Sequence, residues 1–237
     1  MAATAHPEQL ATTGPIPPGA EVIEEILPFK VASAEMFDDS AEVTLFPGEE
    51  ASIAQAVDKR RYEFSTARVC ARRALAELGL PAVPILPGAG GAPRWPDGVV
   101  GSMTHCHGYR AAAVAYATDL RTIGIDAEPH DALPEGVLDA VALPQEQERL
   151  ASLRASSPGT HWDRLLFSAK ESTYKAWFPL AARWLGFEDA DMTFEPLGNS
   201  FTVRLLVPGP EVDGVELTAV TGHWVVRDGL VITAIAM

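Results

Sequence analysis

The sequence predicts an α+β fold made of two similar α/β lobes that meet near residue 118. Two long segments carry apolar residues at the helical period of about 3.6. The C-terminal third instead alternates apolar and polar residues between Gly-Asn, Pro-Gly and Asp-Gly pairs, which is typical of antiparallel strands. RYEFSTAR (61–68) and RLLFSAKE (164–171) share Arg, Phe and Ser at the same offsets, and each opens a helix that precedes strands. This internal echo indicates two related halves.

The first lobe is expected over 21–118. Residues 1–20 are rich in Ala, Thr, Pro and Gly and carry no basic or apolar signal region, so a disordered tail is expected. Segment 49–80 predicts helix, with Ser65 as a candidate interruption or cap. Pro and Gly are frequent in 81–98, which predicts a long loop. Segment 99–117 predicts two strands around a Gly108-Tyr109 turn.

The second lobe is expected over 119–237. It opens with a strand that stops at Pro129, followed by helices over 143–155 and 160–187. The C-terminal strands include VVRDGLVI (225–232), which predicts a hairpin because Asp-Gly favours a tight turn between strands.

Composition excludes several classes of protein. A net charge of −14 argues against a surface dominated by nucleic-acid or anionic-membrane binding. No window approaches eighteen consecutive apolar residues, so no membrane-spanning helix is expected. The only cysteines, Cys70 and Cys106, are too few for a disulfide framework or a four-thiolate zinc site. A reducing, cytoplasmic setting is therefore the expected one.

Two carboxylates end the strand that opens the second lobe. In GIDAEP, Asp126 and Glu128 are two residues apart, so both side chains should point to the same side of the strand. Two adjacent anions repel each other unless a positive group lies near them. A solvated strand end is the alternative interpretation for so short a motif.

A third carboxylate follows in FSAKESTYKAW (167–177). Glu171 and Lys175 are helical neighbours at i, i+4 and could form no more than a surface ion pair. Taken with Asp126 and Glu128, however, Glu171 completes an oxygen-only ligand set without a nearby His/Cys cluster. Such a set suits a hard cation such as Mg²⁺. The three carboxylates therefore predict a magnesium site, with Mn²⁺ able to take its place.

Basic residues gather in one predicted helix. Within fifteen residues the only acid is Glu63, and the cations are Lys59, Arg60, Arg61, Arg68, Arg72 and Arg73. This pattern fits either a solvated helix face or a bound anion such as phosphate. In GSMTHCHGY, His105 after Thr104 could donate a hydrogen bond to an anion or could be a core histidine. There is no GxxxxGK[ST] loop, no dinucleotide fingerprint around GAGG, and no GxSxG elbow.

GSMTHCHGY, GIDAEP and WDRLLFSAKESTYKAW, in this order and spacing, resemble the 4′-phosphopantetheinyl transferases. The chain is most similar to the monomeric, two-lobed type, including its actinobacterial members, from about Lys59 to the C-terminal GLVITAIAM. The resemblance implies a pseudo-twofold fold and transfer of 4′-phosphopantetheine from coenzyme A to a serine of acyl or peptidyl carrier proteins. Adenosine 3′,5′-bisphosphate would leave. Fatty-acid, polyketide or nonribosomal peptide synthases would be activated.

The resemblance also implies roles for individual residues. Asp126 and Glu128 would hold Mg²⁺, with the Ala127 carbonyl contributing, and Glu171 would either complete the metal site or act as general base. Lys170 and Lys175 would neutralise phosphate charge. The remaining contacts to coenzyme A would come from Arg60, Arg68, Thr104 and His105. The chain departs from its relatives in the loop LPGAGGAPRWP, where Pro87 and Gly90 replace lysines and Arg94 could compensate.

Two alternatives to the transferase remain open. One is a catalytically silent module that binds coenzyme A or a nucleotide, and the other is a different Mg²⁺-dependent phosphoryl-transfer enzyme. Because carrier proteins of this class are generally acidic, a chain at −14 would need a local apolar or basic patch to bind one. The candidates lie in YKAWFPLAARWLGF: Trp177, Phe178, Leu180, Arg183 and Trp184. Core positions are the alternative for most of these aromatic residues, with some remaining at the rim of the cleft.

Overall fold

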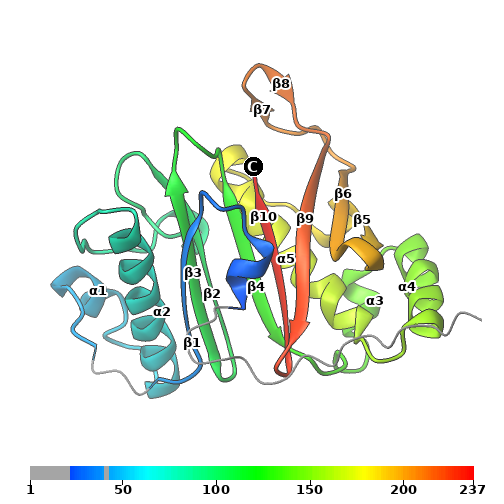
Figure 1. Cartoon of the computed structure of the whole chain (residues 1–237), viewed down its shortest axis with the longest axis horizontal. Helices are drawn as coiled ribbons and strands as arrows, with labels where there is room; N and C mark the ends of the chain where they lie inside the picture. The colour runs from blue at the N-terminus through cyan, green and yellow to red at the C-terminus, as the bar shows by residue number, and fades with distance from the viewer. Residues whose placement is uncertain (1–21, 40–42) are drawn as a thin grey trace, which may run out of the picture.

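The computed structural model describes residues 22–39 and 43–237 (Figure 1). The tail expected over 1–20 lies outside these residues. Helices and antiparallel sheets make up the described chain, which confirms the α+β class. Among the described residues, no helix combines the length and apolar composition that crossing a membrane requires.

The N-terminal lobe is a three-stranded antiparallel sheet with a long helix on one face. The sheet has the order β1-β3-β2, and α2 contacts all three strands. Its elements are η1 (Ile23–Ile26), β1 (Ala32–Met36), α1 (Pro47–Ser52), α2 (Asp58–Glu77), η2 (Ala89–Gly91), β2 (Val99–Cys106) and β3 (Tyr109–Tyr116).

The C-terminal lobe has the same plan on a larger scale. Its sheet has the order β4-β10-β9-β6-β5, and α5 packs across β4, β10 and β5. In Figure 1 the two sheets lie side by side, with α5 behind the second sheet. The elements are β4 (Ile123–Pro129), α3 (Val137–Val141), α4 (Pro144–Ser156), α5 (Trp162–Ala181), η3 (Phe187–Asp189), β5 (Ala190–Glu195), η4 (Pro196–Gly198), β6 (Ser200–Leu205), β7 (Glu211–Val212), β8 (Val215–Glu216), β9 (Ala219–Arg227) and β10 (Leu230–Ala236).

The lobes meet where β2 runs beside β4. No ladder of backbone bonds joins these strands in the sheet order; two side-chain hydroxyls of β2 accept backbone N–H groups instead. Ser102 Oγ accepts from Ile125 at 3.1 Å, and Thr104 Oγ1 accepts from Ala127 at 3.0 Å. One hydrophobic cluster also contains buried residues of η1, β3, β4 and β10 and so crosses the junction. The lobe boundary at residue 118 itself stays a prediction.

Local sequence explains most element boundaries. Helices α1 and α4 each begin at a proline, and a glutamate two residues later accepts the N–H of the residue before the helix. The VVRDGLVI hairpin is confirmed: β9 and β10 are joined by Asp228-Gly229, both with positive φ. The strands around Gly108 and the helices α4 and α5 are also confirmed. The prediction of a break at Ser65 is wrong, because α2 runs through it and the chain leaves the helix at 53–57 instead.

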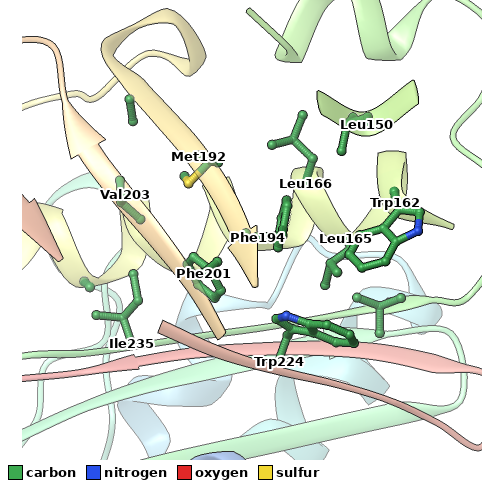
Figure 2. Close-up of a cluster of buried hydrophobic side chains, with 14 of the residues drawn as sticks. Leu150, Trp162, Leu165, Leu166, Met192, Phe194, Phe201, Val203, Trp224 and Ile235 are labelled. Atoms are coloured by element: carbon green, nitrogen blue, oxygen red, sulfur yellow. The ribbon is translucent and has the colours of Figure 1, made fainter. Parts of the chain in front are cut away.

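The largest hydrophobic cluster lies between α5, α4 and the C-terminal sheet (Figure 2). Trp162, at the first residue of α5, packs its ring against Phe194 and Trp224 at centroid distances of 5.9 and 5.6 Å. Trp177 is also part of this core and is 3% exposed. Of the two interpretations open for Trp177, core residue or partner surface, the structure therefore supports the core. The packing of α5 on the sheet determines where the polar face of α5 lies relative to β4.

Candidate active site

Side chains alternate between the two faces of β4, and this places Asp126 and Glu128 on the face that α5 covers. Ile123, Ile125 and Ala127 are buried in the inter-lobe cluster on one face of the strand. The intervening residues point the other way. Gly124 marks this second face, because a Cβ there would lie 2.0 Å from the Ser172 carbonyl oxygen of α5. Asp126 and Glu128 follow on the same side, as the sequence predicts.

Side-chain cations accompany both carboxylates in this structure. Lys175 Nζ lies 2.7 Å from Asp126 Oδ1 and also donates to the Ile125 carbonyl at 3.0 Å. Arg164 Nη1 lies 2.9 Å from Glu128 Oε2. The positive charge that the sequence requires is thus provided in part by the chain itself.

Arg164 had no role in the sequence-based interpretation, yet all of its guanidinium nitrogens are engaged. Nε and Nη2 donate to the carbonyls of Asp131 and Ala132 at 3.0 and 3.1 Å. Arg164 therefore fastens both Glu128 and the following loop to the first turn of α5. The only signal in the sequence is its place in WDRLLF, 36 residues after Glu128, and no local rule connects the two.

Glu171 lies on α5 at the wall of the cleft and interacts electrostatically with Asp126. Burial raises the pKa of Glu171, the Asp126 charge raises it further, and Lys175 opposes both effects. Burial and Asp126 likewise raise the pKa of Glu128, against Arg164 and Lys175. The three carboxylates therefore form one interacting group with excess negative charge.

This group has the chemistry of a site for a hard cation. Within the described residues, however, no three His, Cys, Asp or Glu side chains lie in an arrangement that could hold a metal ion. Even so, Asp126 Oδ2 is buried and has no hydrogen-bond partner in the described chain. The N–H of Ala127 points toward β2, and the carbonyl of a strand residue leaves on the same side as its N–H. An unpartnered carboxylate oxygen and neighbouring oxygen donors fit Mg²⁺.

Lys170 does not take the position that the resemblance implies. It is 3% exposed, and its ammonium contacts Glu146 Oε2 at 2.8 Å and the carbonyls of Phe187 and Ala190 at 2.6 and 3.1 Å. These three acceptors match the three donors of an ammonium group. Lys170 thus ties α5 to α4 and to the segment before β5, and the prediction that it neutralises phosphate disagrees with this geometry.

The basic cluster of α2 divides into an outer and an inner part. Arg60 lies at the surface and donates from Nη1 to His105 Nε2 at 2.8 Å, while Glu63 lies 3.6 Å from His105 Nδ1. Arg68 is 7% exposed, lies over the Phe64 ring and donates to the Ile85 carbonyl at 3.3 Å. Burial lowers the pKa of Arg68 to about 10. Arg60 and His105 are therefore brought together, whereas Arg68 lies in the interior of the N-terminal lobe.

A cleft of about 660 Å³ adjoins the carboxylates. Its walls are α5, the start of β2, and the 86–94 loop, a small hairpin closed by backbone bonds between Gly88 and Ala92 and between Arg94 and Leu86. The tip of this hairpin at Gly90 lies against the ring of Phe178 on α5. The lining includes Glu171 and Lys175 together with Trp95, Tyr174 and the exposed Arg94. The charged group therefore reaches this largely apolar cleft through Glu171 and Lys175.

Comparison with known proteins matches both halves of the chain to one kind of enzyme. A model of the 4′-phosphopantetheinyl transferase N-terminal domain matches residues 48–115, and a model of the 4′-phosphopantetheinyl transferase superfamily matches residues 122–225. The chain is 54% identical over 219 residues to 4′-phosphopantetheinyl transferase Svp of Streptomyces mobaraensis, covering 91% of this chain and 89% of that protein.

Two further relatives are similar over the same extent. The chain is 55% identical to 4′-phosphopantetheinyl transferase Npt of Nocardia iowensis, over 91% of this chain and 99% of that protein. It is 50% identical to 4′-phosphopantetheinyl transferase PptT of Mycobacterium tuberculosis, over 91% of this chain and 98% of that protein.

Proposed function

The chain belongs to the 4′-phosphopantetheinyl transferase superfamily and transfers 4′-phosphopantetheine from coenzyme A to carrier proteins. We propose that it does so in the cleft between α5, the start of β2 and the 86–94 loop. The observation that carries this placement is that Glu171, which interacts with Asp126, and Lys175, which pairs with Asp126, both line a largely apolar cleft. A pyrophosphate needs its charge offset, and a pantetheine arm needs an apolar channel.

Asp126, Glu128 and the Ala127 carbonyl are the proposed ligands of Mg²⁺, or of Mn²⁺ in its place. When bound, the ion offsets charge on the pyrophosphate oxygens. Support comes from the unpartnered Asp126 Oδ2 and from the oxygen-only set of donors. Lys175, already 2.7 Å from Asp126, adds a cation that can turn toward the same oxygens.

Glu171 is the proposed general base toward the carrier serine. Unlike Asp126 and Glu128, it forms no ion pair within 4.0 Å in the described chain. Its pKa is raised by burial and by Asp126, and a more basic carboxylate accepts a hydroxyl proton more readily. As the leaving group, adenosine 3′,5′-bisphosphate retains its negative charge near Lys175 and Arg60.

The remaining assignments concern coenzyme A. Arg60 and His105 are the proposed anion contacts, since both lie at the lobe junction next to Thr104, whose hydroxyl reaches Asp126 Oδ1 at 3.4 Å. Arg68 supports this region from within by holding α2 to the start of the long loop. Arg94, which has no ion pair in the described chain, is the cation left on the loop wall.

The carrier surface is proposed to lie beside the cleft mouth. The rings of Tyr174 and the 71% exposed Trp184 contact each other there, with centroids 4.7 Å apart and planes tilted by 52°. Arg183 lies over the buried Trp177 ring at 4.9 Å. A monomer is proposed because residues of one chain complete the cleft. A reducing compartment is proposed because a sequence with only two cysteines, Cys70 and Cys106, is too poor in cysteine for a disulfide framework.

The test separates the base from the metal ligands. Single-turnover transfer to an apo carrier protein is followed by mass spectrometry across pH for the wild type, Glu171→Gln and Glu128→Gln. Glu171→Gln should lose turnover but still bind Mn²⁺, whereas Glu128→Gln should lose both. Glu148→Gln, on the exposed face of α4, is the matched control. Unchanged turnover in Glu171→Gln would refute the assignment of the base.

A further inference from the structure

Glu63 is a nearly buried carboxylate that lies among cations. The proposed function gives it no role. It lies on α2, is 9% exposed, and has three positive or potentially positive partners. His105 Nδ1 lies 3.6 Å from Glu63 Oε2, and the Arg60 and Lys59 nitrogens each lie 3.9 Å from its carboxylate. A carboxylate within an anion-binding cluster repels the anion and so weakens its binding. Its presence there therefore suggests a second role.

The contacts of His105 determine where its proton resides. Arg60 Nη1 lies 2.8 Å from His105 Nε2, and a guanidinium can only donate hydrogen bonds. Nε2 is therefore the acceptor, and the single ring proton lies on Nδ1, which faces Glu63. The ring is neutral in this state. Burial lowers the pKa of His105 and Arg60 lowers it further, as do Lys175 on α5 and Arg110 on β3, while Glu63 alone raises it.

A phosphate group reverses the requirement at Nε2. Phosphate oxygens accept hydrogen bonds, so Nε2 must carry a proton to contact one. Moving the Nδ1 proton to Nε2 would leave a lone pair directed at the Glu63 carboxylate, which is repulsive. Adding a second proton instead keeps Nδ1–H directed at Glu63 and presents Nε2–H to the phosphate.

We propose that Glu63 is a positioning residue that makes phosphate binding at His105 proton-coupled: as Arg60 turns to the phosphate, Nε2 takes one proton from solvent and the ring binds as imidazolium. This inference rests on the proposed coenzyme A contacts of Arg60 and His105. Glu63 keeps the ring oriented and balances the additional charge. The bound phosphate and Glu63 then face opposite nitrogens of one cation.

Calorimetry of coenzyme A binding, without carrier protein, measures the coupling directly. Titrations at one pH in buffers of different ionisation enthalpy give the number of protons taken up. The pH is set above about 7, because the second pKa of a phosphomonoester is about 6 and the ligand's own protons then contribute little. The wild type should take up a substantial fraction of one proton per coenzyme A.

Variants and a second ligand identify the group and the phosphate. His105→Gln should bind more weakly with no uptake, and Glu63→Gln should still bind with reduced uptake, because the neutral ring can then change tautomer freely. Glu77→Gln, exposed near the end of the same helix, should behave as wild type. If proton uptake disappears with dephospho-coenzyme A, His105 contacts the 3′-phosphate. If the uptake persists with this ligand, His105 contacts the pyrophosphate.

The outcomes separate this inference from the proposed function. Wild-type binding with no proton uptake, or uptake that persists in His105→Gln, overturns the coupling while leaving the coenzyme A site in place. Undiminished binding in both Arg60→Ala and His105→Gln overturns the proposed contacts themselves. Thermal unfolding of each variant shows whether a loss of binding is only a loss of fold.

Discussion

Replacing Lys170 by methionine removes the cation from an ion pair whose partners are both almost completely buried. The side chains of Lys170 and Glu146 are 2% and 1% exposed, and their atoms lie 2.8 Å apart. The substitution leaves a buried carboxylate and the carbonyls of Phe187 and Ala190 without their shared donor. Removing one partner of such a pair typically costs about 3–5 kcal/mol.

Two backbone contacts of Glu146 place the expected loss in free energy of unfolding toward the lower end of this range. Glu146 still accepts the N–H groups of Leu143 and Met192, each at 2.7 Å, so its charge is not wholly unpartnered. For a domain of this size each kcal/mol shifts Tm by about 2–4 °C, which gives a drop of roughly 6–15 °C. The double variant Lys170→Met, Glu146→Gln should lose less stability than the two single variants added together, because it leaves no unpaired buried charge.

Thermal unfolding and single-turnover transfer are the two measurements. Lys170→Met should lose stability while its folded fraction, assayed well below Tm, retains turnover within about tenfold. Lys175→Met, whose side chain is 28% exposed beside Asp126, should lose less Tm than Lys170→Met but should lose turnover. The opposite pattern, a Lys170→Met variant with an unchanged Tm and no transfer, would show that Lys170 takes part in the chemistry and that its buried contacts are secondary.

Three further predictions address the charged group. Asp126→Ala should abolish transfer while leaving the circular dichroism spectrum unchanged, and near-normal turnover with Mg²⁺ would contradict the metal assignment. Arg164→Ala should weaken Mn²⁺ binding about 10–100-fold by electron paramagnetic resonance, since it holds a ligand in place, whereas Arg154→Ala on exposed α4 should not. The pKa of Glu171 is raised in the folded state, so its contribution to stability is present at low pH and is lost as pH rises through that pKa. Glu171→Gln should therefore raise the Tm of the metal-free protein at about pH 8 more than at about pH 5, and an equal shift at both would refute this electrostatic origin.

Strand alternation was sufficient to predict how the carboxylates lie. A period of two places Asp126 and Glu128 on one face, and the structure puts α5 and Glu171 over that face. The same rule could not predict the counter-charge. Arg164 reaches Glu128 through tertiary packing across 36 residues, which neither periodicity nor spacing encodes.

Helical periodicity, applied more strictly, argues against two of the predicted phosphate contacts. Arg68 occupies the same stripe of α2 as Phe64, Ala67, Ala71 and Leu75, which is buried against the N-terminal sheet. Lys170 likewise lies on the buried stripe of α5, between Leu166 and Thr173, whereas Glu171 is rotated by about 100° from it. In both cases the residue type suggested a phosphate contact and its helical position indicated the interior. The bond between Arg60 and His105, which determines the histidine tautomer, required the structure.

Mass spectrometry of a carrier protein tests the central claim most directly. An apo carrier protein is incubated with the enzyme, coenzyme A and Mg²⁺, and its intact mass is followed together with that of a variant whose acceptor serine is alanine. A mass increase of one 4′-phosphopantetheine group on the wild-type carrier alone, lost with Asp126→Ala, is the predicted result. An unchanged carrier mass across a panel of acyl and peptidyl carriers, with coenzyme A bound but not consumed, would contradict it.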